Sequence, residues 1–172
     1  MAPSRAYGRT ELAGGACVAE ELPTSSAIAR TAWLDGVCGR SFVRTMIDLE
    51  SRHDTLGVVD DQRGQPTWSA DVAARLVDLG PHPGRGATGV LHAVGCGEAS
   101  RYESAREVCA RRGADPDPVR RVSSGAFPRR APRPAYSGLV HGRRQELGLP
   151  ALRDRRSAVH EAFPFIRKES PS

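Results

Sequence analysis

The feature that most constrains the fold of this chain is the alternation of short apolar stretches with amphipathic helical patterns. Apolar residues at i, i+4 and i+7, as at Phe42, Met46 and Leu49, are typical of a helix that buries one face. The predicted helices lie at 5–22, 41–52, 70–79, 100–112, 139–147 and 153–162, and the predicted strands at 25–33, 55–62, 89–95 and 119–122. This alternation predicts an α/β or α+β layered architecture.

Serine and glycine residues mark where several of these helices begin and end. Ser41, Ser69 and Ser100 each stand just before an amphipathic run and are expected to be N-caps. Gly113 follows the helix predicted at 100–112 and is expected to stop it. The Pro- and Arg-rich stretch 126–136 predicts an irregular loop.

Length and charge exclude several classes of protein. The chain has 172 residues, which suits one domain or part of a larger one, and a formal net charge of +5. Lys168 is the only lysine, and the arginines are scattered beside acidic residues. With only 5% aromatic residues for base stacking, we expect no nucleic-acid partner. No apolar run approaches the ~18 residues of a membrane span, and the N-terminus has no secretory pattern, so we expect a cytoplasmic protein.

Cysteines and glycines offer two further candidate sites, and the sequence argues against both. Cys17, Cys38, Cys96 and Cys109 lack the tight spacing of zinc ligands and are expected to be buried free thiols. Residues 84–89 have the form G-x-G-x-x-G, but a predicted helix precedes them and a predicted strand follows. A dinucleotide fingerprint needs the opposite order, so we interpret these glycines as a loop.

Several motifs together resemble one enzyme family. They are YGRTELAG (7–14), ARTAWLDG (29–36), FVRTMIDL (42–49), VVDDQRGQPTW (58–68), the helix that follows, and RPAYSGL (133–139). In this order they resemble the dTDP-4-dehydrorhamnose reductases, which are extended short-chain dehydrogenases/reductases, over roughly residues 5–163.

The resemblance implies a fold and a division of the chain. It implies the C-terminal part of an NAD(P)-binding, Rossmann-like α/β reductase, mostly the smaller substrate-binding domain. Residues 1–40 would be a remnant of the cofactor domain, 41–164 the substrate-binding domain, and 165–172 a tail. The glycine-rich turn and the strands of the cofactor sheet, which come first in the family, are expected to be missing.

The resemblance also implies a catalytic residue. Tyr7 matches the tyrosine of the family's Y-x-x-x-K pair, the general acid that protonates the alkoxide when a nicotinamide delivers hydride. Glu11 occupies the lysine position, and a carboxylate one turn from a phenol disfavours the phenolate form. The alternative is that Tyr7 is an ordinary exposed tyrosine on a terminal helix.

Four more residues are substrate-binding candidates by the same resemblance. Trp33 matches a tryptophan near the substrate, or it closes a strand as a half-buried aromatic. Gln62 and Thr67, in the D-D-Q…P-T segment, either shape the sugar-nucleotide pocket or hold a turn together through side-chain hydrogen bonds. Arg133 either clamps the pyrophosphate, which guanidinium binds bidentately, or is a surface arginine.

By resemblance the reaction is NAD(P)H-dependent reduction of dTDP-4-dehydro-L-rhamnose to dTDP-L-rhamnose. We expect this chain alone to bind neither NADPH nor NADH and to be inactive. The alternatives are a non-catalytic sugar-nucleotide-binding or regulatory protein on the same fold, and a truncated gene product. The family allows a Mg²⁺ ion. A homodimer or a separate cofactor-domain polypeptide is the expected protein partner, because the first helix and strand would expose apolar faces.

Overall fold

The computed structural model describes residues 6–80, 87–128, 130–131 and 133–168. Its helices are α1 (Ala6–Glu21), α2 (Phe42–Glu50), α3 (Ser69–Asp78), α4 (Arg101–Arg112), α5 (Gly142–Glu146) and α6 (Arg155–Lys168), with a 3₁₀ turn η1 (Ser124–Ala126). Its strands are β1 (Ala27–Arg30), β2 (Leu34–Asp35), β3 (Leu56–Val59), β4 (Arg63–Gly64), β5 (Thr67–Trp68), β6 (Gly89–His92), β7 (Ala99–Ser100) and β8 (Val119–Val122). The alternation of strands and helices agrees with the predicted α/β class.

The strands pair between distant parts of the chain. β1 pairs with β6, β2 with β5 and β3 with β8, all in parallel, while β4 pairs with β7 antiparallel. Helices occupy the connections between the parallel partners, as parallel pairing requires. Each described sheet therefore has two strands and takes its support from the packed helices.

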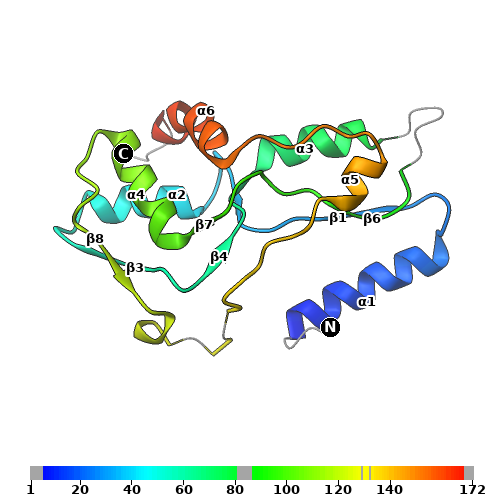
Figure 1. Ribbon diagram of the computed structural model, residues 1–172, viewed down its shortest axis with the longest axis horizontal. Coiled ribbons are helices and arrows are strands. Elements are labelled where there is room, and N and C mark those ends of the chain that lie inside the picture. Colours follow the sequence, from blue (N-terminus) through cyan, green and yellow to red (C-terminus); the bar gives the residue numbers. More distant parts are fainter. Residues whose placement is uncertain (1–5, 81–86, 129, 132, 169–172) are drawn as a thin grey trace.

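The main core lies where α2, α4 and α6 pack on β3 and β8, at the left of Figure 1. The apolar spacing predicted for α2 places Val43, Met46 and Ile47 inside. α6 extends past the predicted helical end at 162, because Phe163 and Ile166 are also buried in this core. A smaller cluster of Val72, Ala93 and Leu152 lies under α3.

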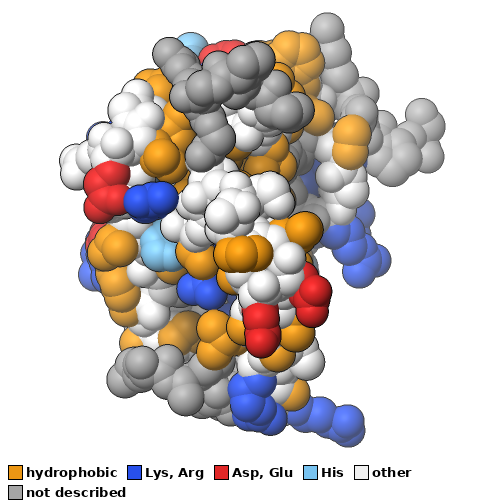
Figure 2. Space-filling view, turned by 90° about the vertical axis from the view of Figure 1, so that its right-hand side faces the viewer, with side chains coloured by type: hydrophobic (Ala, Val, Ile, Leu, Met, Phe, Trp, Pro, Cys, Tyr) orange, Lys and Arg blue, Asp and Glu red, His pale blue; other side chains and the backbone are white. Residues whose placement is uncertain are grey.

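α1 has no buried residue and lies alongside the β1–β6 pair (Figure 1). Its described contact with β1 is at Gly15, where a Cβ would lie 3.8 Å from the Ile28 side chain. Leu12 and Val18 are among its exposed apolar side chains, and Leu22, just after it, is exposed too, as expected from the sequence. Hydrophobic side chains are distributed over this end of the molecule in Figure 2.

The predicted helix boundaries are confirmed where side chains make the cap. Ser41 Oγ accepts from the Arg44 N–H, and Ser100 forms a full capping box with Glu103. Gly113 ends α4 in the left-handed conformation, with φ of 78°. The prediction for Ser69 was wrong, because Trp68 occupies the N-cap of α3 and makes no side-chain cap.

The expectation that the cysteines are buried free thiols is tested by the structure. All four cysteines are free, but the prediction of burial was wrong for Cys17 and Cys38, which are exposed, and for the half-buried Cys96. Cys17 is exposed because α1 buries none of its faces.

Residues 84–86 of the glycine-rich stretch lie outside the described residues, and Gly89 begins β6. No helix of the described part is long and apolar enough to cross a membrane.

Candidate functional site

Trp33 lies between β1 and β2, in a conformation fixed by tertiary contacts. Its φ of 49° is in the left-handed region that residues with side chains rarely adopt. The Trp33 carbonyl oxygen accepts from the Thr67 N–H at 3.1 Å, and the indole Nε1 donates to Ser137 Oγ at 2.8 Å. Gly64 makes room for the ring, since a Cβ there would lie 2.4 Å from the indole Cε2. Both the backbone and the ring of Trp33 are therefore held in place.

Arg101, the first residue of α4, covers the Trp33 ring. Its guanidinium carbon lies 3.7 Å from the centroid of the Trp33 ring and 4.7 Å from that of Phe42. Burial lowers the pKa of the Arg101 guanidinium to about 10; the Asp35 carboxylate opposes this shift and the positive charge of Arg133 adds to it. The positive charge of Arg133 therefore acts on the Arg101 guanidinium, although the two residues are far apart in sequence.

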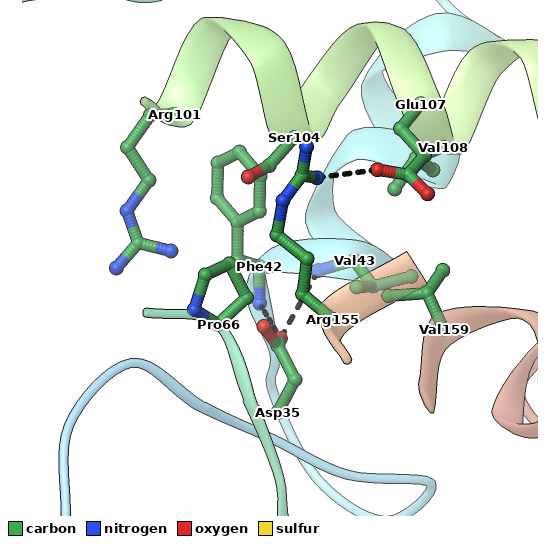
Figure 3. Close-up of a pocket in the computed structure, with 10 residues that line it drawn as sticks. All are labelled: Asp35, Phe42, Val43, Pro66, Arg101, Ser104, Glu107, Val108, Arg155 and Val159. Atoms are coloured by element: carbon green, nitrogen blue, oxygen red, sulfur yellow. Dashed lines mark hydrogen bonds and ion pairs between the residues drawn. The ribbon is translucent and has the colours of Figure 1, made fainter. Parts of the chain in front are cut away.

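Trp33, Ser137, Arg101 and Phe42 together are called the Trp33 cluster. Asp35 fixes the beginning of α2 beside this cluster. Its Oδ1 accepts from the N–H groups of Phe42 at 2.8 Å and Val43 at 3.2 Å. Burial raises the pKa of the Asp35 carboxyl, and those two hydrogen bonds act in the opposite direction. Figure 3 shows Asp35 at the edge of a cavity of about 20 Å³, near the ion pair of Arg155 and Glu107. That volume suits one water molecule and excludes a nucleotide sugar.

A buried glutamine holds the segment after Ser137. Gln65 Oε1 accepts from the Leu139 N–H at 2.7 Å, and its Nε2 donates to the Leu139 carbonyl at 3.2 Å and lies 3.3 Å from His141 Nε2. The pKa of His141 is lowered by burial first, and then by the charges of Arg144 and His92. The β4–β5 turn thereby positions the segment that carries Ser137.

The predicted substrate-binding residues have different surroundings. Thr67 is 2% exposed, and its hydroxyl donates to the Gln65 carbonyl at 2.9 Å and accepts from the Gly95 N–H at 3.0 Å. Gln62 is half-buried in the turn between β3 and β4. Arg133 is exposed in the predicted irregular loop. Thr67 and Arg133 are both linked to the Trp33 cluster, the first by a hydrogen bond and the second by its charge on Arg101.

The two aspartates between Val59 and Gln62 serve neighbouring elements. Asp60 Oδ1 accepts from Ser100 Oγ at 2.5 Å, which ties the end of β3 to the start of α4. Asp61 accepts from both the N–H and the hydroxyl of Ser124, and these bonds lower the pKa of its carboxyl. Their carboxylates are therefore engaged in holding turns.

Tyr7 and Glu11 stand on α1, apart from this cluster. The Tyr7 side chain is 75% exposed, and Glu11 is exposed one turn later. The hydrogen bond found at Tyr7 is one that its backbone carbonyl accepts from Thr10 Oγ1 at 2.8 Å. Within the described residues, no interaction joins either side chain to Trp33 or Arg133.

The described residues do not fit a nicotinamide cofactor. Its diphosphate needs a glycine-rich turn that leads into helix N–H groups left free for the ligand. Gly36 and Gly39 lie between β2 and α2, but Asp35 and Ser41 already accept from the first N–H groups of α2. At the start of α4, the side chains of Ser100 and Glu103 likewise already accept from backbone N–H groups, as a capping box. Among the described side chains, no group of three or more His, Cys, Asp or Glu is placed to hold Mg²⁺.

Sequence reasoning missed three residues of this cluster. Ser137 lies inside the RPAYSGL motif, which was a usable signal. Gln65 lies inside the VVDDQRGQPTW motif, which was also a usable signal. Arg101 carries no local mark, since it acquires its role from a residue far away in the chain.

Comparison with known proteins finds a matching family model and several curated relatives. Residues 1–167 match the family described as "RmlD substrate binding domain". A probable dTDP-4,6-dihydroxy-2-methyloxan-3-one 4-ketoreductase of Streptomyces antibioticus is 53% identical over 165 residues, which cover 96% of this chain and 55% of the relative. A dTDP-4-dehydrorhamnose reductase of Streptomyces griseus is 46% identical over 166 residues, covering 95% and 55%. The chain thus spans about half the length of these curated relatives.

Solved structures give the same fold. A dTDP-4-dehydrorhamnose reductase from Clostridium acetobutylicum superimposes with a TM-score of 0.88 at 34% identity, covering 96% of this chain and 57% of that one. The enzyme from Bacillus anthracis, solved in complex with NADP, has a TM-score of 0.81 at 30% identity, covering 92% and 54%.

Proposed function

This chain belongs to the RmlD substrate binding domain family, and from that premise we propose that it is the sugar-nucleotide-binding part of a reductase. The substrate is a dTDP-linked keto sugar, with dTDP-4-dehydro-L-rhamnose as the reference compound, whose C4 carbonyl becomes the hydroxyl of dTDP-L-rhamnose. The relatives named above share a dTDP sugar and a ketone reduction in their descriptions, which supports this class.

The observation that carries the proposal is the fixed indole of Trp33, with the Arg101 guanidinium over it and the charge of Arg133 acting on Arg101. An aromatic ring offers an apolar surface to a sugar, and a guanidinium binds phosphate oxygens bidentately. Thr67 keeps the turn beneath Trp33 in place, and Gln62 offers an amide from the adjoining turn. These four residues form the proposed substrate-binding set.

Tyr7 is the proposed proton donor to the alkoxide oxygen, through its phenolic hydroxyl. Glu11 stands at the position of the family lysine. The described residues offer no cradle for a nicotinamide, so this chain alone binds the sugar nucleotide without reducing it. We propose that a cofactor domain outside these 172 residues holds the nicotinamide.

A non-catalytic sugar-nucleotide-binding or regulatory protein is the second candidate. Glu11 and the 75% exposure of Tyr7 favour it, because neither feature serves proton transfer. The two candidates differ in what Glu11→Lys does once a cofactor half from a working relative is fused to the chain. A reductase site recovers about 10²–10⁴-fold in NADPH oxidation, the scale of positioned proton transfer. A binding protein gains nothing.

Calorimetric titration of the 172-residue chain tests the binding proposal. We expect dTDP-4-dehydrorhamnose to bind, Trp33→Leu and Arg133→Gln each to weaken it about tenfold or more, and NADPH to give no heat. Arg130→Gln removes an exposed arginine from the same loop and should bind as the wild type does. Failure of the sugar nucleotide to bind overturns the proposal, and a low-micromolar dissociation constant for NADPH overturns the expected absence of a cofactor site.

A further inference from the structure

An open groove with a volume of about 980 Å³ follows the outer face of α4. The residues that α4 contributes to it alternate with the buried ones, so they lie on the opposite side of the helix from the core. Six arginines and three glutamates are among the lining residues, an excess of three positive charges. We call this hollow the arginine groove, after Arg63, Arg106, Arg111, Arg121, Arg155 and Arg156.

At one end of the groove, where α4 meets α6, guanidinium groups outnumber the carboxylates that pair with them. Arg155 and Arg111 share Glu107, with N···O distances of 2.5 Å and 3.7 Å. Arg111 Nε is buried, and no described group accepts a hydrogen bond from it. Among the described residues, the Arg156 guanidinium has no ion-pair or hydrogen-bond partner, although its backbone N–H donates to Asp154. Three guanidinium groups and one carboxylate leave two positive charges in excess.

The N-terminus of α6 adds to this positive charge. Arg155 and Arg156 occupy the first turn of α6, which contains no acidic residue, and the N-terminus is the positive end of the helix dipole. Asp154, just before the helix, offsets part of that charge. Cations in the first turn oppose the dipole, and natural sequences break such local rules chiefly at functional sites. An anionic ligand would relieve this repulsion.

The lining of the groove favours a small, highly charged ligand over a protein segment. Protein interfaces are anchored by buried aromatic and aliphatic side chains. Among the lining residues only Ala110, Pro116 and Tyr102 are apolar or aromatic, and the guanidinium groups of Arg121 and Arg106 lie 4.7 Å and 5.8 Å from the Tyr102 ring centroid. Guanidinium groups match phosphate oxygens with paired N–H donors. The volume of the groove admits a chain of several phosphates.

We propose that the arginine groove binds a triphosphate chain, free or attached to a nucleoside, with Arg111 and Arg156 as its principal contacts. Neither Arg133 nor any residue of the Trp33 cluster lines the groove. Figure 3 shows the Arg155–Glu107 pair, which lines both the groove and the small cavity beside Asp35. The groove is therefore a second anion site, separate from the proposed sugar-nucleotide site.

Calorimetric titration of the full chain with inorganic tripolyphosphate and with ATP tests this proposal. We expect both to bind, Arg156→Gln to weaken binding about threefold, and Arg111→Gln combined with Arg156→Gln to weaken it at least tenfold. The matched control is Arg52→Gln combined with Arg120→Gln, which removes the same charge from exposed positions outside the groove and should bind as the wild type does. Thermal melting of each variant checks that the fold is kept. Arg156→Gln alone removes a side chain without a described partner, so its effect is independent of folding.

Each outcome decides for or against the groove. Equal losses in the two double variants overturn the proposal, because net charge would then account for the binding. Absence of binding of both probes also overturns it, and binding of hexaglutamate in their place assigns the groove to an acidic protein segment. Binding of tripolyphosphate alone supports a free chain, and similar affinities for the two probes support a chain carried by a nucleoside. Trp33→Leu should leave the tripolyphosphate affinity unchanged, so the groove and the proposed function can fail separately.

Discussion

Trp33 adopts a strained backbone conformation, and its neighbours hold it there. A non-glycine residue at positive φ costs on the order of 1–3 kcal/mol, so the contacts with Thr67, Gly64 and Ser137 must outweigh that cost. Strain of this kind, held by residues from three segments, is consistent with the central place given to Trp33 in the proposed site.

Gly64→Ala tests this arrangement. The new Cβ would overlap the indole, so we expect the free energy of unfolding to fall by about 1–3 kcal/mol, and ligand binding to weaken as Trp33 moves. Urea denaturation followed by circular dichroism measures the first effect. Gly142→Ala, where a Cβ meets nothing within 4 Å, should change stability little. Equal effects at the two glycines would contradict the packing argument.

Asp35 gives the protein a pH dependence of predictable sign. Because burial raises the pKa of its carboxyl above 3.8, the folded state holds this proton at pH values where the unfolded chain has lost it. The free energy of unfolding therefore falls as pH rises from about 3.8 through the folded pKa. Asp35→Asn does not titrate and keeps an oxygen for the same N–H groups. We expect its stability relative to the wild type to increase across that window, measured by urea denaturation at several pH values.

Asp61→Asn provides the opposite control. Hydrogen bonds from Ser124 lower the pKa of the Asp61 carboxyl, so wild type should lose its advantage over this variant as pH falls through the folded pKa. Parallel stability curves for wild type and Asp35→Asn would contradict the burial of that carboxyl.

At the scale of elements, α4 is the helix with the most complete set of end signals. Ser100 is fully buried, accepts from the Glu103 N–H and donates to Asp60, while Glu103 accepts from the Ser100 N–H. Ser100→Ala should lower the free energy of unfolding by about 1–2 kcal/mol, since the cap and the tie to β3 are lost together. Chemical denaturation measures this, and Ser69→Ala, whose hydroxyl caps nothing, should stay within about 0.5 kcal/mol. A larger loss at Ser69 would contradict the assignment of the caps.

At the scale of the whole molecule, the exposed apolar side chains include Leu12 and Val18 on α1 and Val90 on β6, and Figure 2 shows hydrophobic side chains over the face that it draws. Leu12 and Val18 are 45% and 42% exposed, and the described pairing leaves β1 with one strand neighbour. Apolar patches and open strand edges favour association. We expect the isolated chain to self-associate with increasing concentration, and Leu12→Glu with Val18→Glu to reduce this in light scattering. Phe165→Glu, also exposed but on α6, which lies apart from α1 in Figure 1, should have no effect. A wild-type chain that stays monomeric would contradict this prediction.

Much of the fold was predictable because its signals are local. The apolar spacing in 41–52, the serine caps at Ser41 and Ser100 and the stop at Gly113 each depend on residues within about one or two helical turns. The same locality explains the errors. The cap assigned to Ser69 and the burial assigned to Cys17 both depend on how an element is placed against the rest of the chain.

The candidate site divides in the same way. The motifs alone show that Trp33 and Arg133 stand where the family pattern has them, and that Glu11 replaces a lysine. The fold was needed to show that Ser137 holds the Trp33 indole across 104 positions, and that Arg101 covers it. The physical reason is that helix periodicity and capping join near neighbours, whereas the pairing of β2 with β5 and the placement of α4 join distant ones. Those long-range contacts bring the Trp33 indole, the Ser137 hydroxyl and the Arg101 guanidinium together.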